Sequence, residues 1–178
     1  MNLVLIGLRG TGKSTVGRML SDQLGWQFFD TDSLVQERAG KTIREIFEQA
    51  GEAGFRILEA EIVREVSAHD RAVIATGGGS VLNPDNVIAL KHNSFVIHLT
   101  ADPVELWRRI CGDGSSHAQR PPLTRDAHSG IDELKQLLLS RAAIYEHARD
   151  VEVSVENRLP DEVAEAVLMM LRAHGVQL

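Results

Sequence analysis

The stretch Gly7-Leu8-Arg9-Gly10-Thr11-Gly12-Lys13-Ser14 fits the phosphate-binding loop pattern G-x-x-x-x-G-K-[ST] at every position. It follows an apolar run that predicts a buried strand and precedes a helical pattern of apolar residues: Leu3-Val4-Leu5-Ile6, then Val16, Met19, Leu20 and Leu24. Glycines allow the backbone N–H groups to face an anion, and the helix N-terminus adds positive potential. The pattern predicts that Lys13 reaches the β- and γ-phosphates and that Ser14 ligates Mg²⁺. We therefore expect the chain to bind a nucleoside triphosphate.

The composition indicates a single acidic domain of ordinary size. The chain has 178 residues, with 19 basic and 25 acidic side chains and a net charge of −6. Its lysines and arginines are not clustered, which argues against a nucleic-acid partner. Cys111 is the single cysteine, and no apolar stretch approaches the length of a membrane span. We expect residues 1–178 to form one soluble, cytoplasmic domain that works as a monomer without membrane contact.

Short apolar runs alternate with longer helical patterns along the chain. The expected strands are 2–6, 26–29, 72–75, 94–99 and 151–155. The expected helices are 13–24, 31–49 with a break at Gly40, 51–68, 84–91, 102–110, 131–148 and one that follows Pro160. This alternation predicts a three-layer α/β fold with a parallel sheet that is covered by helices on both faces. Ligands of such sheets bind at the carboxyl ends of the strands.

One stretch of the chain lacks hydrophobic periodicity. Residues 111–130 are rich in Gly, Ser, His and Pro. A loop of this length inside a compact domain is either disordered or a functional lid, and we place a candidate lid at about 112–129. Its Arg120 precedes Pro121-Pro122 and could contact a transferring phosphate or remain a solvated loop charge.

Two carboxylates follow the second expected strand, in Asp30-Thr31-Asp32. Beside a triphosphate, one carboxylate can hold the Mg²⁺ shell and the other can accept the proton of an attacking hydroxyl. The alternative is a helix N-cap, which Asp30 or Thr31 could provide. The carboxylate pair alone does not decide between catalysis and capping.

Three further groups fall at a strand end or on helices. Gly77-Gly78-Gly79 follows the third strand and exposes a run of N–H groups, although a flexible turn would have the same sequence. Arg141 falls within the apolar stripe of helix 131–148, where a buried arginine requires an anionic partner. Arg56 and Glu59 share a helix face, which a surface ion pair would also explain. The seven histidines are scattered, and we expect all of them at the surface.

Together these features resemble the shikimate kinase family over nearly the whole chain. The resemblance rests on an ordered set of motifs: the phosphate loop 7–14, Asp30-Thr31-Asp32, Phe55-Arg56-Ile57-Leu58-Glu59, Gly77-Gly78-Gly79, Arg120-Pro121, and Arg141 followed by Tyr145. It implies a P-loop kinase fold, similar to nucleoside monophosphate kinases, with sheet order 2-3-1-4-5 and a lid. It also implies Mg²⁺-dependent transfer of phosphate from ATP to the 3-hydroxyl of shikimate, a step of chorismate and aromatic amino-acid biosynthesis.

The resemblance implies a role for each matching residue. ATP would be held by Gly10, Thr11, Gly12, Lys13, Ser14 and Thr15, and the metal by Ser14 and Asp30. Shikimate would be held by Asp32, Arg56, Gly78, Gly79 and Arg141, with both arginines on its carboxylate. Arg109, Asn157 and Arg158 would flank the adenine. Arg120 would contact ATP and stabilise the transferring phosphoryl group, so that Lys13, Asp32 and Arg120 would be catalytic. The candidate lid departs from the family pattern in its length and in its Arg-Pro-Pro-Leu sequence.

Two alternatives stay open at this point. Another small P-loop kinase, acting on gluconate, a nucleoside monophosphate or a coenzyme precursor, would share the phosphate loop but would not need two arginines for one carboxylate. A regulator that binds ATP without phosphorylating a metabolite would have no need for Lys13, Ser14, Asp32 and Arg120 together.

Overall fold

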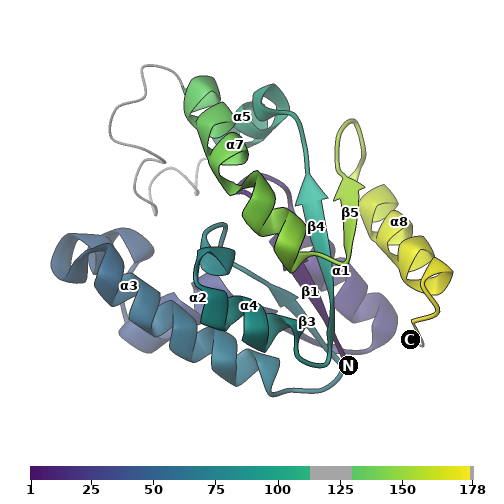
Figure 1. The fold of residues 1–178 in the computed structure, drawn as a ribbon, viewed down its shortest axis with the longest axis horizontal. Helices are drawn as coiled ribbons and strands as arrows, with labels where there is room; N and C mark the ends of the chain where they lie inside the picture. Colours follow the sequence, from purple (N-terminus) through teal and green to yellow (C-terminus); the bar gives the residue numbers. More distant parts are fainter. Residues whose placement is uncertain (113–129, 177–178) are drawn as a thin grey trace.

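The fold is built around a parallel five-stranded sheet. The computed structural model describes residues 1–112 and 130–176. The strands are β1 (Asn2–Ile6), β2 (Gln27–Asp30), β3 (Ala72–Ala75), β4 (Ser94–Thr100) and β5 (Val151–Ser154). They pair in parallel in the order β2-β3-β1-β4-β5 (Figure 1), so the predicted fold class and strand order are confirmed.

Helices cover both faces of this sheet. They are α1 (Lys13–Leu24), α2 (Thr31–Ala39), α3 (Ile43–Ser67), α4 (Pro84–Lys91), α5 (Pro103–Gly112), α7 (Gly130–Ala148) and α8 (Pro160–Ala173), with a 3₁₀ turn η1 (Ser80–Leu82). Apolar residues of α1 and α8 pack on one face. Apolar residues of α2, α3, α4, α5 and α7 pack on the other face. The sheet is therefore shielded from solvent on both sides, as its apolar strands require.

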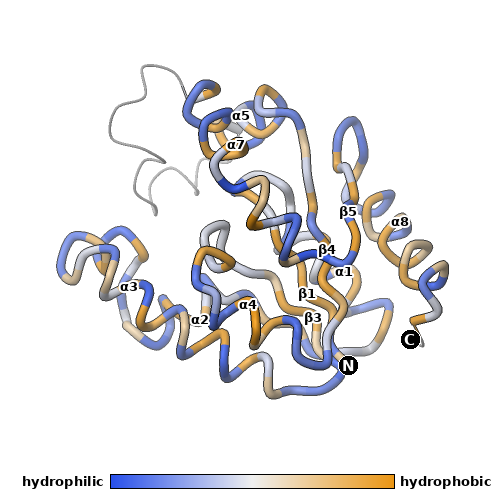
Figure 2. The backbone as a smooth tube through the Cα atoms, viewed as in Figure 1, coloured by the Kyte–Doolittle hydropathy of each residue, from blue (hydrophilic) through white to orange (hydrophobic). Residues whose placement is uncertain are grey.

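The burial pattern explains why these segments take up these positions. All five residues of the central strand β1 are buried, and Figure 2 shows β1 and β3 hydrophobic, whereas α3 alternates between hydrophobic and hydrophilic residues. The edge strand β5 instead alternates buried and exposed residues. The predicted helix break at Gly40 is confirmed by its left-handed φ of 62°. A second kink occurs in α3 at Gly51, where φ is 67°, so helical backbone resumes close to the predicted start at 51.

The prediction that every histidine lies at the surface is wrong for His98, which is only 6% exposed because it points from β4 into the side of the sheet covered by α7.

The candidate lid at 112–129, with Arg120, lies outside the described residues except for Gly112, the last residue of α5. Among residues 1–112 and 130–176, we find no helix with the length and apolar character needed to cross a bilayer.

Candidate active site

The phosphate loop lies between the end of β1 and the start of α1. Gly7, Gly10 and Gly12 have φ values of 142°, 89° and 83°, a region that other residues rarely adopt. A Cβ atom at Gly7 would lie 2.4 Å from the carbonyl oxygen of Leu99, so the loop approaches β4 too closely for a side chain. Lys13 Nζ donates to the carbonyl oxygens of Gly7 and Leu8, at 2.8 Å each. The loop thus holds the lysine ammonium inside its own curve, at the N-terminus of α1.

Asp30, the last residue of β2, performs two tasks with its two carboxylate oxygens. Oδ1 accepts a hydrogen bond from the backbone N–H of Ser33, at 3.1 Å, and so caps α2. Oδ2 accepts one from the Ser14 hydroxyl, at 2.5 Å. Mg²⁺ prefers oxygen ligands and takes one or two from the protein beside phosphate and water. Ser14 and Asp30 therefore form a donor set that fits the predicted metal ion.

A cavity of about 280 Å³ opens beside the phosphate loop. It is lined by Gly10, Thr11, Gly12, Thr15, Val16, Arg109, Val155, Arg158, Pro160 and Val163. Arg109 donates from Nη2 to the carbonyl oxygen of Val155 and pairs through Nε with Glu105, at 2.8 Å each. The structure therefore brings Arg109 and Arg158 together with the loop around one cavity. Asn157 is in an exposed turn with φ of 52° and does not line this cavity.

The carboxylates of Asp32 and Glu59 converge on Gly77, just past the end of β3. A Cβ atom at Gly77 would lie 2.5 Å from Asp32 Oδ1 and 2.9 Å from Glu59 Oε1. The Gly77 N–H donates to the Thr31 hydroxyl at 3.0 Å, which fixes the start of the glycine segment 77–79 against α2. Asp32 is 8% exposed, so its carboxylate sits in a shielded position at the carboxyl edge of the sheet.

Arg56 reaches the glycine segment from α3. Its Nη1 donates to Glu59 Oε2 at 2.7 Å, and its Nη2 lies 3.2 Å from Glu52 Oε1. Glu59 is 1% exposed, so this pair is not the surface ion pair that the sequence also allowed. Burial raises the pKa of the Glu59 carboxyl, the nearby Arg56 guanidinium lowers it in part, and the Asp32 carboxylate adds to the rise.

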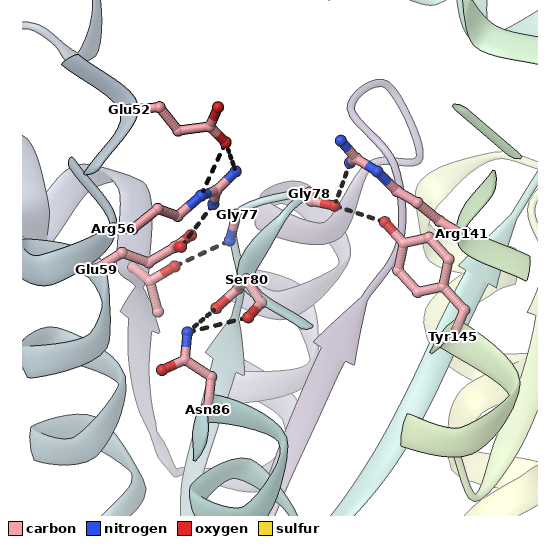
Figure 3. Close-up of polar contacts among 10 residues, drawn as sticks. Glu52, Arg56, Glu59, Gly77, Gly78, Ser80, Asn86, Arg141 and Tyr145 are labelled. Atoms are coloured by element: carbon pink, nitrogen blue, oxygen red, sulfur yellow. Dashed lines mark hydrogen bonds and ion pairs between the residues drawn. The ribbon is translucent and has the colours of Figure 1, made fainter. Parts of the chain in front are cut away.

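Arg141 reaches the glycine segment from the opposite side, on α7. Its Nη1 donates to the Gly78 carbonyl oxygen at 3.0 Å, and the Tyr145 hydroxyl donates to the same oxygen at 2.6 Å. Figure 3 shows Arg56 and Arg141 on either side of the segment. The side chain is half-buried, and no carboxylate of residues 1–112 or 130–176 pairs with it, so the anionic partner expected from the sequence is not supplied by the described protein.

The two halves of the site meet at Gly78. A Cβ atom there would lie 3.3 Å from the Arg9 backbone nitrogen and 3.5 Å from the Gly7 carbonyl oxygen, so the glycine segment packs against the phosphate loop. The predicted residues at the ends of β1, β2 and β3 are thus brought together with the arginines of α3 and α7. No role was predicted for Glu52 or Tyr145, and Thr31, predicted only as a possible helix cap, instead accepts from the Gly77 N–H. The R-x-x-x-Y spacing, which places Arg141 and Tyr145 on one face of α7, was the available signal for Tyr145.

Comparison with known proteins identifies one family for this chain. The family model described as Shikimate kinase matches residues 9–172. A shikimate kinase of Symbiobacterium thermophilum is 42% identical over 175 residues, which cover 98% of each protein. One of Gloeobacter violaceus is 44% identical over 176 residues, covering 97% of this chain and 93% of the relative.

Solved structures lead to the same family. Shikimate kinase from Acinetobacter baumannii in complex with shikimate superposes with a TM-score of 0.90 at 29% identity, covering 99% of this chain and 95% of that one. Shikimate kinase from Aquifex aeolicus gives 0.81 at 36% identity and covers 99% of each chain. A gluconokinase from Sinorhizobium meliloti, with a TM-score of 0.55 at 13% identity and covering 97% of this chain and 91% of that one, shares the fold alone. The chain belongs to the shikimate kinase family.

Proposed function

We propose that the chain transfers the γ-phosphoryl group of ATP to the 3-hydroxyl of shikimate, which yields shikimate 3-phosphate and ADP. One observation carries the proposal: two arginines from different helices, Arg56 and Arg141, flank a glycine segment that packs directly on the phosphate loop. Two guanidinium groups suit a substrate with one carboxylate, because arginine binds carboxylates in bidentate geometry. The similarity to a shikimate kinase bound to shikimate supports the same substrate.

The proposed roles follow from the charge that develops during phosphoryl transfer. The transition state spreads negative charge over the γ-phosphoryl oxygens, so the protein has to supply position and positive potential. We assign the potential to Lys13 and to the loop N–H groups, with Arg120 as a further contributor that is predicted from the sequence. Asp32 would orient the shikimate hydroxyl and accept its proton, and Gly78 and Gly79 would contact shikimate through their backbone.

The metal and adenine sites are proposals of the same kind. Ser14 and Asp30 would hold Mg²⁺, and the bound ion would neutralise charge on the β- and γ-phosphates. Gly10, Thr11, Gly12 and Thr15 would hold the phosphates, and the cavity lined by Arg109 and Arg158 would take the adenine. Asn157 and the single-domain, monomeric and cytoplasmic assignments stay predictions from the sequence.

The direct test is release of ADP with and without shikimate, in the presence of Mg²⁺. We expect shikimate to raise the rate far above the ATPase background, whereas gluconate and nucleoside monophosphates do not. A rate that responds to gluconate instead would support the neighbouring kinase class. No response to any hydroxy acid would favour an ATP-binding regulator and would overturn the proposal.

A further inference from the structure

The Gly78 carbonyl oxygen accepts two hydrogen bonds from one helix. Arg141 Nη1 and the Tyr145 hydroxyl both reach it from α7, at 3.0 and 2.6 Å. Arg141 is half-buried and faces the substrate site, whereas Tyr145 is only 2% exposed and is shielded from that site. The hydroxyl of Tyr145 is therefore available for the glycine segment rather than for the substrate.

The direction of this carbonyl determines the direction of the next amide. In a trans peptide the carbonyl oxygen of Gly78 and the N–H of Gly79 point to opposite sides. With the carbonyl held toward α7, the Gly79 N–H is directed toward α3, which carries Arg56. On that side, a Cβ atom at Gly79 would lie 2.5 Å from Arg56 Nη2, so the guanidinium packs against Gly79. Gly79 thus lies directly beside the Arg56 guanidinium.

Tyr145 is itself fixed by a residue on the sheet. Its ring stacks on the His98 imidazole with a centroid distance of 4.4 Å and an interplanar angle of 11°. His98 is buried on β4, two residues before that strand ends at Thr100. Burial lowers the pKa of His98 to about 4, with further lowering by Arg149 and Lys13, so the ring is neutral near pH 7. Burial raises the pKa of Tyr145 to about 12, so its hydroxyl keeps the donated proton.

We propose that Tyr145 is a positioning residue for shikimate: its hydroxyl, held in place by the His98 ring, fixes the Gly78–Gly79 peptide so that the Gly79 N–H faces the substrate. The inference rests on the proposed function. Without the hydroxyl, Arg141 becomes the single donor to the Gly78 carbonyl among the described residues, so the peptide is held less firmly and the Gly79 N–H loses its fixed direction. Binding of ATP involves neither group and is unaffected.

Tyr145→Phe tests this directly because it removes the hydroxyl and keeps the ring stack. We expect kcat/KM for shikimate to fall about 10-fold, as for a lost hydrogen bond plus misplacement, with KM for ATP unchanged. Ser21→Ala is the matched control, since Ser21 also donates a hydroxyl to a backbone carbonyl, of Trp26 at 2.8 Å, away from the site. Ser21→Ala should lower thermal stability about as much as Tyr145→Phe does, and it should leave the KM values for shikimate and for ATP unchanged.

A second pair of variants tests the stack without altering Tyr145. His98→Phe keeps a ring against Tyr145 and should retain the wild-type KM for shikimate, whereas His98→Ala removes it and should raise that KM. The inference is overturned if Tyr145→Phe binds shikimate normally, or if both substrates lose affinity equally, as in general loosening. A wild-type enzyme that does not phosphorylate shikimate would instead refute the proposed function on which the inference depends.

Discussion

Replacing Arg141 and Arg56 separately by leucine should separate substrate binding from stability. Arg141 makes one hydrogen bond to the Gly78 carbonyl, which keeps Tyr145 as a donor after the substitution. Leucine also suits the apolar neighbours on α7, so stability should change by no more than about 1 kcal/mol. Loss of a bidentate contact to the substrate carboxylate costs about 2–5 kcal/mol, which corresponds to a rise in the KM for shikimate of roughly 30- to 4,000-fold.

Arg56→Leu should affect both properties. It would also lose a contact to shikimate, but it leaves the Glu59 carboxylate almost fully buried without its guanidinium partner. An orphaned buried group costs about 1–3 kcal/mol. For a chain of this size that lowers Tm by about 2–12 °C, which Arg141→Leu should not do.

The assay is coupled ADP detection over a shikimate titration, together with thermal melts of each variant. Arg44→Leu provides a matched control for Arg56→Leu. Arg44 also lies on α3, and it pairs with Glu48 at 3.0 Å in an exposed position. It should change neither the KM nor Tm appreciably. If Arg141→Leu destabilises the protein as much as Arg56→Leu and keeps a normal KM, then Arg141 is a structural residue and its assignment to the substrate is wrong.

The pH dependence of Arg56→Leu has a definite sign. Burial raises the pKa of Glu59 in the folded state, and the Arg56 guanidinium lowers that pKa in part. Removal of Arg56 therefore raises the pKa of Glu59 further. A carboxyl with a raised folded pKa stabilises the protein below its unfolded pKa of about 4.5 and loses that stabilisation as the pH rises through the folded value. The stability deficit of Arg56→Leu should therefore shrink as the pH falls from neutrality toward 4.5. A constant deficit would contradict this account.

The remaining predictions concern the catalytic edge of the sheet and His98. Lys13→Met should abolish turnover while circular dichroism stays unchanged, because the ammonium donates to carbonyl oxygens of the phosphate loop; a collapsed fold would contradict a purely functional role. Asp32→Asn should lower kcat about 10²- to 10⁴-fold with ATP still bound, and a near-normal kcat would refute the role as base. Asp30→Asn should keep the helix cap and Tm but raise the Mg²⁺ requirement, whereas Asp30→Ala should also lose about 0.5–2 kcal/mol of stability. Because His98 has a depressed folded pKa of about 4, stability should fall as the pH drops below 6.5, by up to about 2 kcal/mol at pH 5, and denaturant titrations of His98→Gln should show a smaller fall.

Much of the fold could be predicted because its signals are local. The phosphate-loop pattern constrains a strand, a turn and a helix start within a few residues, and the structure has β1 and α1 at those positions. The break at Gly40 was predictable because left-handed backbone favours glycine. The 3₁₀ turn Ser80–Leu82 was not predicted, since one turn is too short to produce a periodic pattern.

The missed parts of the site depend on contacts between distant segments. The burial of Glu59 results from the packing of α3 against the glycine segment, and a three-residue spacing from Arg56 is equally common on a solvent-facing helix. His98 has a polar side chain in an otherwise apolar strand, and only the register of β4 beside β1 shows that it points toward α7. The bond from Tyr145 to Gly78 joins residues 67 positions apart, so the spacing on α7 could place Tyr145 beside Arg141 but could not indicate its acceptor.

Asp30 shows why capping and catalysis need not be alternatives. The sequence offered a helix N-cap or a metal ligand; in the structure Oδ1 caps the helix, and Oδ2 accepts from Ser14, where the proposed metal would bind. The cap to Ser33 fixes the rotation of the carboxylate, which leaves Oδ2 directed at the Ser14 hydroxyl. A ligand whose orientation is set by a hydrogen bond loses less conformational entropy when a metal binds. The same bond that starts α2 therefore also orients the proposed metal ligand, and Asp32 follows two residues later with its carboxylate against Gly77.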